Sequence, residues 1–223
     1  MPGSPLPPAR KTAGREAIAR AALATLDDVG LDRLTIRRVA ERLDVRPSAL
    51  YWHFSDKQDL VDYLAEALMG HELDRFAQPG PQTPWAGWLT DLAACTRTAL
   101  LSRRDGPRLF AGASPASGPL IPAIESTLGV LLAAGFDIAA AAYGANTIIN
   151  FTVGFALEEQ AVHLRASSPG GSAGQLARLR AAGTYPNLVR AAAVTGAGDF
   201  DAEFAHGIAL IIAGMQASQR PGN

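Results

Sequence analysis

The sequence predicts an all-α protein, with an amino-terminal three-helix helix-turn-helix domain followed by a larger carboxy-terminal helical domain. Hydrophobic residues recur at intervals of three and four along most of the 223 residues, whereas the alternation typical of strands never persists. Apolar residues make up 48% of the chain and charged residues 18%, which is typical of a folded protein. The cluster AQPGPQTP at 77–84 interrupts the helical pattern and predicts a domain boundary.

The chain opens with a proline-rich arm and a first helix. Four prolines within 1–12 oppose a helix there, so we expect this arm to be disordered. Apolar residues at helical spacing predict a helix over 13–29, and Gly30 is placed to end it. The predicted DNA-binding domain covers 13–60.

Two further short helices are predicted on either side of a tight turn. Thr35 is an N-cap candidate for a second helix that extends to Leu43. A third helix of about seven residues is expected to begin near Arg46 or Pro47, because proline fits the first turn of a helix. Two helices joined by so short a turn favour a DNA-binding unit.

The remaining chain is predicted to be helical, with a connecting helix that leads into the second domain. Ser55 or Asp56 is the expected cap of the connecting helix, which extends to about residue 76. The domain over 77–223 is expected to contain one short helix within 103–122 and further helices at 85–102, 123–135, 137–165, 174–182 and 199–219.

The charge is distributed unevenly along the chain. Residues 1–57 carry ten Lys/Arg and seven Asp/Glu, a net charge of +3, while 76–223 carry nine of each sign. The positive charge permits nucleic-acid binding without establishing it. The single Cys95 excludes a disulfide framework, and the amino terminus lacks the apolar segment of a secretory signal. A cytoplasmic location is expected.

The run 138–157 contains no charged residue and is long enough to cross a bilayer. Its two Asn, two Thr and several Ala make it only weakly hydrophobic, and clustered basic flanks are missing. We therefore expect a helix buried within protein rather than a membrane span. Because the last helix also has a broad apolar face, these two helices predict a partner subunit.

Residues at and after the predicted turn have the properties of a DNA-binding surface. Small side chains at the start of the third helix would allow close approach to base edges in a major groove. The rings of Tyr51, Trp52 and His53 carry polar groups that can donate to phosphate oxygens, whereas Leu50 and Phe54 are expected in the core. The candidate DNA-binding residues are Thr35, Arg37, Arg46, Pro47, Ser48, Ala49, Tyr51, Trp52, His53 and Lys57.

The segment LTIRRVAERLDVRPSALYWHFSDKQDLVDYLAEAL resembles the DNA-binding domain of the tetracycline-repressor (TetR) family. The segments ALLSRRDGPRLFAG, LLAAGFDIAAAAYG, FTVGFALEEQ and GIALIIAGMQ resemble the carboxy-terminal domain of the tetracycline repressors within it. The resemblance implies that Arg37 contacts bases and that Tyr51, Trp52, His53 and Lys57 contact phosphate and sugar. Arg46 could pair with a guanine edge or contact only solvent or phosphate. The differing residues at 46–49 imply a different operator.

The resemblance also implies a homodimer, formed by the helices at about 137–165 and 199–219, which binds double-stranded operator DNA and a small-molecule effector. The tetracycline repressors hold magnesium with the drug through a His, for which this sequence has Phe110. With Leu73 and Leu92 also apolar, we expect no metal or cofactor and a hydrophobic effector other than magnesium–tetracycline. The candidate ligand-binding residues are Leu73, Leu92, Thr96, Phe110, Ala113, Thr127, Asn150, Phe151 and Glu158.

Alternatives remain for two of these residues and for the whole protein. Glu158 could instead be the solvated end of its helix, and Asn150 could hydrogen-bond to a facing helix across the dimer. An enzyme is not expected, because no Gly-rich segment contains Gly-Lys-Ser/Thr and no His stands at helical spacing from Cys95. The alternative to a ligand-responsive repressor is a helical protein-interaction scaffold, which would show no salt-sensitive DNA binding.

Overall fold

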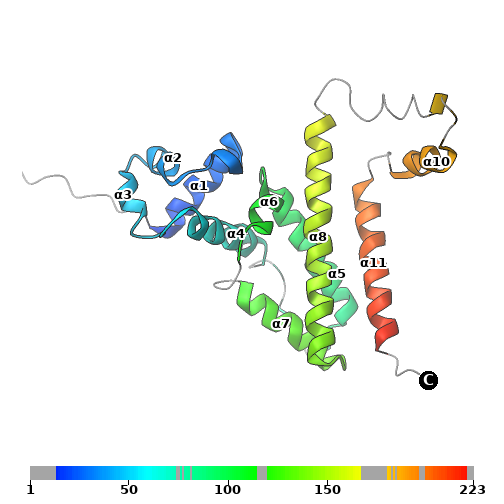
Figure 1. Cartoon of the computed structure of the whole chain (residues 1–223). Helices are drawn as coiled ribbons and strands as arrows, with labels where there is room; N and C mark the ends of the chain where they lie inside the picture. The colour runs from blue at the N-terminus through cyan, green and yellow to red at the C-terminus, as the bar shows by residue number, and fades with distance from the viewer. Residues whose placement is uncertain are drawn as a thin grey trace, which may run out of the picture.

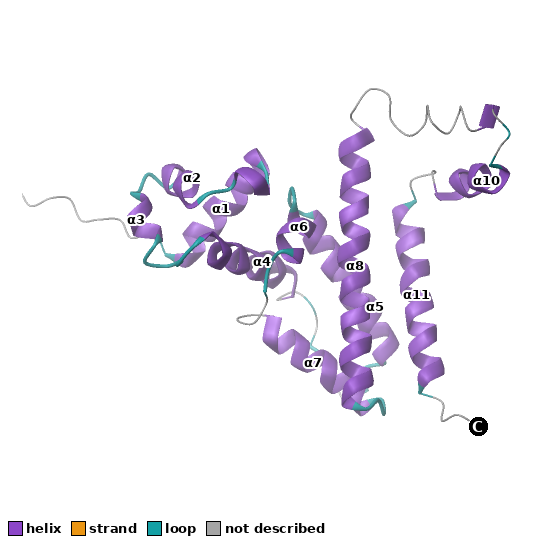
Figure 2. Cartoon of the chain, viewed as in Figure 1, coloured by secondary structure: helices purple, strands orange, loops and turns teal. Residues whose placement is uncertain are grey.

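The computed structural model describes residues 14–73, 76, 78–80, 82–114, 120–166, 180–181, 183, 185–195 and 199–219. All regular structure in these residues is helical, which confirms the predicted fold class (Figure 2). The first elements are α1 (Arg15–Val29), the 3-10 helix η1 (Leu31–Arg33), α2 (Ile36–Arg42), α3 (Pro47–Leu50) and α4 (Lys57–Leu73). They are followed by α5 (Trp85–Leu101), α6 (Gly106–Ala111), α7 (Leu120–Ala133), α8 (Ile138–Ala166), α10 (Pro186–Thr195) and α11 (Phe200–Ser218).

The helices α1, α2 and α3, with η1 between α1 and α2, form a separate head at one end of α4 (Figure 1). The local signals in the sequence explain its boundaries. Gly30 ends α1 with a φ of 78°, and Thr35 Oγ1 caps α2 by accepting the backbone N–H of Arg38 at 3.3 Å. Pro47 occupies the first turn of α3, where its missing N–H leaves no hydrogen bond unmade.

The helix-turn-helix contains a backbone feature that the sequence pattern did not reveal. Asp44, in the turn between α2 and α3, has a φ of 54°, a left-handed conformation that Asp tolerates better than most residues. The N–H of Val45 donates to the carbonyl of Ala40 at 3.0 Å. This turn brings α3 against α2, and Leu50 and Phe54, each 1% exposed, are in the core as predicted.

The carboxy-terminal part is built around α8, the long helix that stands upright in Figure 1. Helix α5 packs against α8 and also against α4, while α7 and α11 contact α8 as well. The rings of Phe151 and Phe155 on α8 pack against Phe204 on α11 with centroid separations of 5.8 and 5.2 Å. Helix α4 connects this body to the head.

Several predicted elements differ from the structure. The third helix has four residues rather than about seven, η1 and α10 were not predicted, and α7 begins at Leu120 rather than at 123. Proline is tolerated in the first turn of a helix, so Pro122 does not prevent α7 from beginning two residues earlier, at Leu120. The expected arm at 1–12 lies outside the described residues, as does the predicted helix at 174–182 apart from 180 and 181, which are helical.

One helix of the described part, Ile138–Arg165, is long and apolar enough to cross a membrane by length and composition alone. A core helix of a soluble protein passes the same test. Within this single chain only 22% of its most apolar window is buried, so the helix is less covered than the sequence led us to expect. Exposed apolar side chains along it include Ile138, Tyr143, Val162 and Leu164.

Candidate DNA-binding surface and effector cavity

Of the ten candidate DNA-binding residues, eight are exposed, and Ala49 and His53 are half-buried. Trp52 is 89% exposed and Tyr51 57% exposed, directly after α3, whereas His53 is half-buried. The adjacent Phe54 is buried and packs its ring against Tyr63 at a centroid distance of 5.4 Å. The aromatic run therefore divides into one core residue, Phe54, and two large exposed rings, Tyr51 and Trp52, of the amphipathic kind that is enriched at interfaces.

The polar members of this surface are held in different ways. Arg37 projects from α2 and pairs with Glu41 at 3.0 Å, with 81% of its side chain exposed. Lys57 donates from Nζ to the carbonyl of Leu31 at 3.2 Å, which ties the start of α4 to η1. Arg46, Pro47 and Ser48 are exposed and Ala49 is half-buried. Exposed pairs of this kind are weak, so Glu41 holds the Arg37 side chain only loosely.

Helix α4 begins with the cap that the sequence predicted. Asp56 Oδ1 accepts the N–H of Asp59 at 2.9 Å, and Asp59 Oδ2 accepts the N–H of Ser55 at 2.9 Å. This reciprocal capping satisfies two free donors at the helix start. Because Ser55 directly follows Phe54, these bonds tie the end of the aromatic run at 51–54 to the first turn of α4.

A cavity of about 460 Å³ lies in the body between α4, α5, α6, α7 and α8. Seven of the nine candidate ligand-binding residues line it: Leu73, Leu92, Thr96, Phe110, Ala113, Thr127 and Asn150. The other lining residues are Met69, Ala111, Leu120, Ala123, Ile124, Ala145, Asn146, Ile149 and Val153. None of these residues is ionisable, so the cavity is suited to a mostly apolar, uncharged molecule.

The remaining two candidates lie elsewhere in the chain. The Phe151 ring faces α11, where it stacks on Phe204, and so Phe151 packs the body instead of lining the cavity. Glu158 is exposed on α8. No cluster of three or more His, Cys, Asp or Glu side chains suited to a metal occurs in the described part.

The neighbouring Glu159 belongs to an ion-pair group that sequence reasoning missed. Arg97 on α5 donates to both carboxylate oxygens of Glu159 at 2.8 Å and to Asp201 of α11 at 2.7 Å. Hydrogen bonding to Glu159, ahead of the opposing effect of burial, raises the pKa of Arg97. The three residues lie far apart in sequence, so no local spacing signals the contact.

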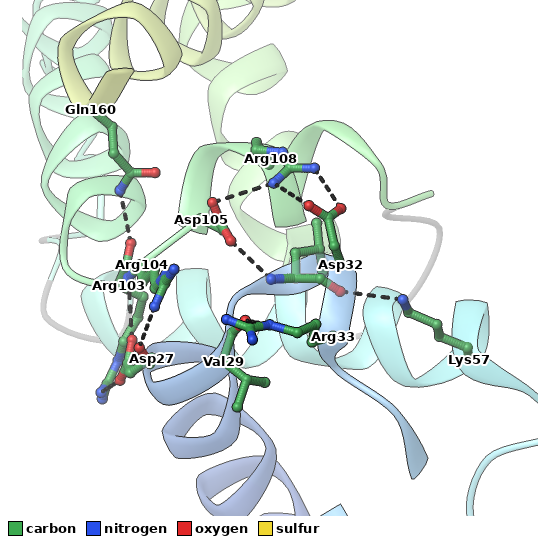
Figure 3. A network of polar contacts seen from close by, with 11 residues as sticks. Asp27, Val29, Asp32, Arg33, Lys57, Arg103, Arg104, Asp105, Arg108 and Gln160 are labelled. Atoms are coloured by element: carbon green, nitrogen blue, oxygen red, sulfur yellow. Dashed lines mark hydrogen bonds and ion pairs between the residues drawn. The ribbon is translucent and has the colours of Figure 1, made fainter. Parts of the chain in front are cut away.

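A second polar network joins the body to the head (Figure 3). Asp105, just before α6, accepts the N–H of Leu31 at 2.8 Å, and Arg108 donates to Asp32 at 2.8 Å. Arg103 pairs with Asp27 at 2.8 Å, and its carbonyl accepts Gln160 from α8 at 3.0 Å. Since α6 also carries Phe110 and Ala111 of the cavity wall, it touches both the cavity and the head.

An exposed aromatic and basic surface on a helix-turn-helix head, joined to a body with an apolar cavity, defines a DNA-binding transcriptional regulator. The chain belongs to the tetR family of bacterial regulatory proteins, whose sequence model matches residues 18–64. The model of the tetracyclin repressor-like C-terminal domain matches residues 78–219. The resemblance seen in the sequence is thereby confirmed.

Known relatives cover nearly the whole chain. Tetracycline repressor protein class C of Escherichia coli is 41% identical over 203 residues, covering 91% of this chain and 90% of that protein. A TetR variant from Acinetobacter baumannii AYE in complex with minocycline has 32% identity and a TM-score of 0.73, covering 94% and 99% of the two chains. ActR of Streptomyces coelicolor in complex with (S)-DNPA has 27% identity and a TM-score of 0.75, covering 94% and 100%.

Proposed function

We propose that this protein is a homodimeric repressor that leaves a palindromic operator when a small hydrophobic effector enters the cavity of the body. The observation that carries the proposal is the position of α6, which lines the cavity with Phe110 and bonds to the head through Asp105 and Arg108. The family's regulators bind operator DNA and small molecules. A change in the cavity can therefore alter the position of the head.

The effector is proposed to be different from magnesium–tetracycline. Mg²⁺ is held through carboxylates and other oxygen ligands, but the described cavity wall has no ionisable residue. Phe110, Leu73 and Leu92 instead offer apolar surface. The minocycline and (S)-DNPA complexes of the relatives support a small-molecule site in this body while differing in the ligand.

The dimer is proposed to form through α8 and α11. Tyr143 on α8 is 72% exposed and Leu210 on α11 is 61% exposed, and a second subunit would cover both. In the dimer, two heads would contact half-sites about one helical turn apart, roughly 34–36 Å. Binding of the effector would favour a pose of α4 in which this spacing is lost. Full release requires a difference of about 5.5 kcal/mol in the effector's affinity for the two poses.

DNA binding is tested by selecting duplexes from a random pool and measuring fluorescence anisotropy over a range of salt concentrations. We expect a palindromic site whose affinity falls steeply with salt, and a dimer in sedimentation equilibrium. Tyr51→Ala and Lys57→Ala should weaken all sequences alike, whereas Arg37→Ala should flatten sequence preference. A monomer that binds no duplex at low salt would refute the proposal and favour a helical scaffold.

A further inference from the structure

Thr96, in the wall of the cavity, has a polar group without a partner. Its side chain is 0% exposed, and Oγ1 is the one buried side-chain nitrogen or oxygen that makes no hydrogen bond within the described part of the chain. A hydroxyl removed from water without a new partner costs free energy. Such an atom in a native structure requires an explanation.

The other helical threonines show that the ordinary solution was open to Thr96. Each donates from its hydroxyl to the carbonyl four residues earlier, as a threonine within a helix commonly does. The distances lie between 2.7 and 3.3 Å for Thr25, Thr90, Thr98, Thr127, Thr147, Thr152 and Thr195. Thr96 lies well inside α5, yet its hydroxyl does not use the carbonyl of Leu92.

The polar groups around Thr96 fall into two kinds. Thr127 is satisfied, since its Oγ1 accepts Trp88 Nε1 at 3.2 Å and donates to the carbonyl of Ala123 at 2.8 Å. Asn146 and Asn150, four residues apart on α8, line the cavity and are exposed in the single chain. The cavity thus combines apolar walls and two accessible amides with Thr96, whose hydroxyl lies just behind the wall and is closed to solvent in the free chain.

We propose that Thr96 is a specificity-determining anchor: when an uncharged, mostly apolar effector enters, the Thr96 side chain, which is closed to solvent in the free chain, turns its hydroxyl into the cavity and hydrogen-bonds a hydroxyl or carbonyl oxygen of the effector. The proposal rests on the assignment of this cavity as the effector site. The apolar walls bind the carbon skeleton, while the Thr96 hydroxyl selects molecules that carry an oxygen at the matching place. A skeleton without that oxygen leaves the hydroxyl unpartnered and binds less tightly.

A first test needs no ligand. Thr96→Val keeps the shape and the β-branch of the side chain and removes the hydroxyl. Because it removes a buried polar atom that has no partner, we expect the melting temperature of the free protein to rise by about 2–4 °C. Thr98→Val is the matched control, since Thr98 donates to the carbonyl of Ala94 at 2.9 Å in an exposed position. A lower melting temperature for Thr96→Val would show that the hydroxyl is satisfied and overturn the proposal.

A second test uses pairs of aromatic probes whose members differ by one oxygen: naphthalene with 2-naphthol, pyrene with 1-hydroxypyrene, and anthracene with anthrone. In the wild type, we expect the oxygenated member of at least one pair to bind about three- to tenfold tighter. That preference should fall to about one in Thr96→Val and persist in Thr96→Ser. An equal preference in wild type and Thr96→Val, or no binding by any pair, would refute the proposal.

The same samples are tested for operator binding, so that the two proposals can fail separately. A wild-type protein that binds no duplex would contradict the repressor function, whatever the probes show. Intact operator binding with no dependence on Thr96 contradicts only the anchor.

Discussion

The carboxylate of Asp105 accepts the backbone N–H of Leu31 at 2.8 Å, and this hydrogen bond links the start of α6 to the head (Figure 3). Asp105 is 9% exposed and has a φ of 55°. Its side chain is thus fixed by both burial and backbone conformation. Phe110 of the same helix α6 lines the cavity, and Lys57, one of the candidate DNA-binding residues, donates to the carbonyl of the same Leu31.

Replacing Asp105 tests this link. Asp105→Ala leaves the Leu31 N–H without its acceptor, so we expect a loss of about 1–3 kcal/mol in the free energy of unfolding, measured by urea denaturation. The response of operator binding to effector should weaken as well. Asp105→Asn retains an acceptor oxygen and a residue that tolerates positive φ, and should stay close to wild type. An Asn variant as damaged as the Ala variant would argue against the hydrogen bond as the cause.

The Arg108–Asp32 pair has a defined pH signature. The hydrogen bond from Arg108, helped by its charge, lowers the pKa of Asp32 from its ordinary value of 3.8. The contribution of the pair to stability is therefore complete above about pH 3.8 and is lost as the pH falls through the lower pKa of the folded protein. Urea denaturation of wild type and Arg108→Gln should show a difference that shrinks below this value. Arg33→Gln is the control, because within the described residues the Arg33 side chain donates to the carbonyl of Val29 and to no carboxylate.

The exposed Trp52 should matter for DNA and little for folding. Since Trp52 is 89% exposed, Trp52→Ala should change the free energy of unfolding by no more than about 0.5 kcal/mol. Operator affinity, measured by anisotropy, should fall about tenfold or more through loss of a donor to a charged phosphate. In contrast, Phe54→Ala should mainly lower stability, because it removes a buried ring, and should destabilise the head by about 3–5 kcal/mol. Unchanged DNA affinity in Trp52→Ala would remove this residue from the interface.

Gly207 is required by the close approach of α11 to α8. A Cβ at Gly207 would collide with the ring of Phe151 at Cζ, so Gly207→Ala should destabilise the protein by about 1–3 kcal/mol through overpacking. The displaced α11 should also weaken the proposed dimer in sedimentation equilibrium. Gly87 has nothing within 4 Å of such a Cβ, and Gly87→Ala should instead stabilise α5 by about 0.5–1 kcal/mol. Equal effects of the two substitutions would contradict the packing argument.

The Arg97–Glu159 pair is buried, with 13% and 6% of the two side chains exposed. Glu159→Ala leaves the Arg97 charge without its main partner and should cost about 3–5 kcal/mol in thermal or urea denaturation. Asp201 contacts the same guanidinium with 90% of its side chain exposed, so Asp201→Ala should cost at most about 1 kcal/mol. A larger effect at Asp201 would reverse this order and refute the burial argument.

By itself, the sequence determined the features that depend on neighbours within a turn or two. Thr35, Asp56 and Gly30 mark helix ends through bonds to atoms within four residues, and Phe54 is apolar at core spacing. These local contacts form wherever the chain folds as a helix. Seven of the nine residues that the family resemblance suggested for the effector site line the cavity, whereas Phe151 and Glu158 lie elsewhere.

Only the tertiary structure decided which distant groups meet. Asp105 lies 74 residues from Leu31, Arg97 lies 62 residues from Glu159, and neither spacing carries a periodic signal. Like the other helical threonines, Thr96 has a carbonyl four residues earlier to which its hydroxyl could donate. That the hydroxyl lacks a partner beside the cavity is visible only in the packed structure. Side-chain burial and polar pairing across elements arise when helices pack, so they are absent from any pattern read along the chain.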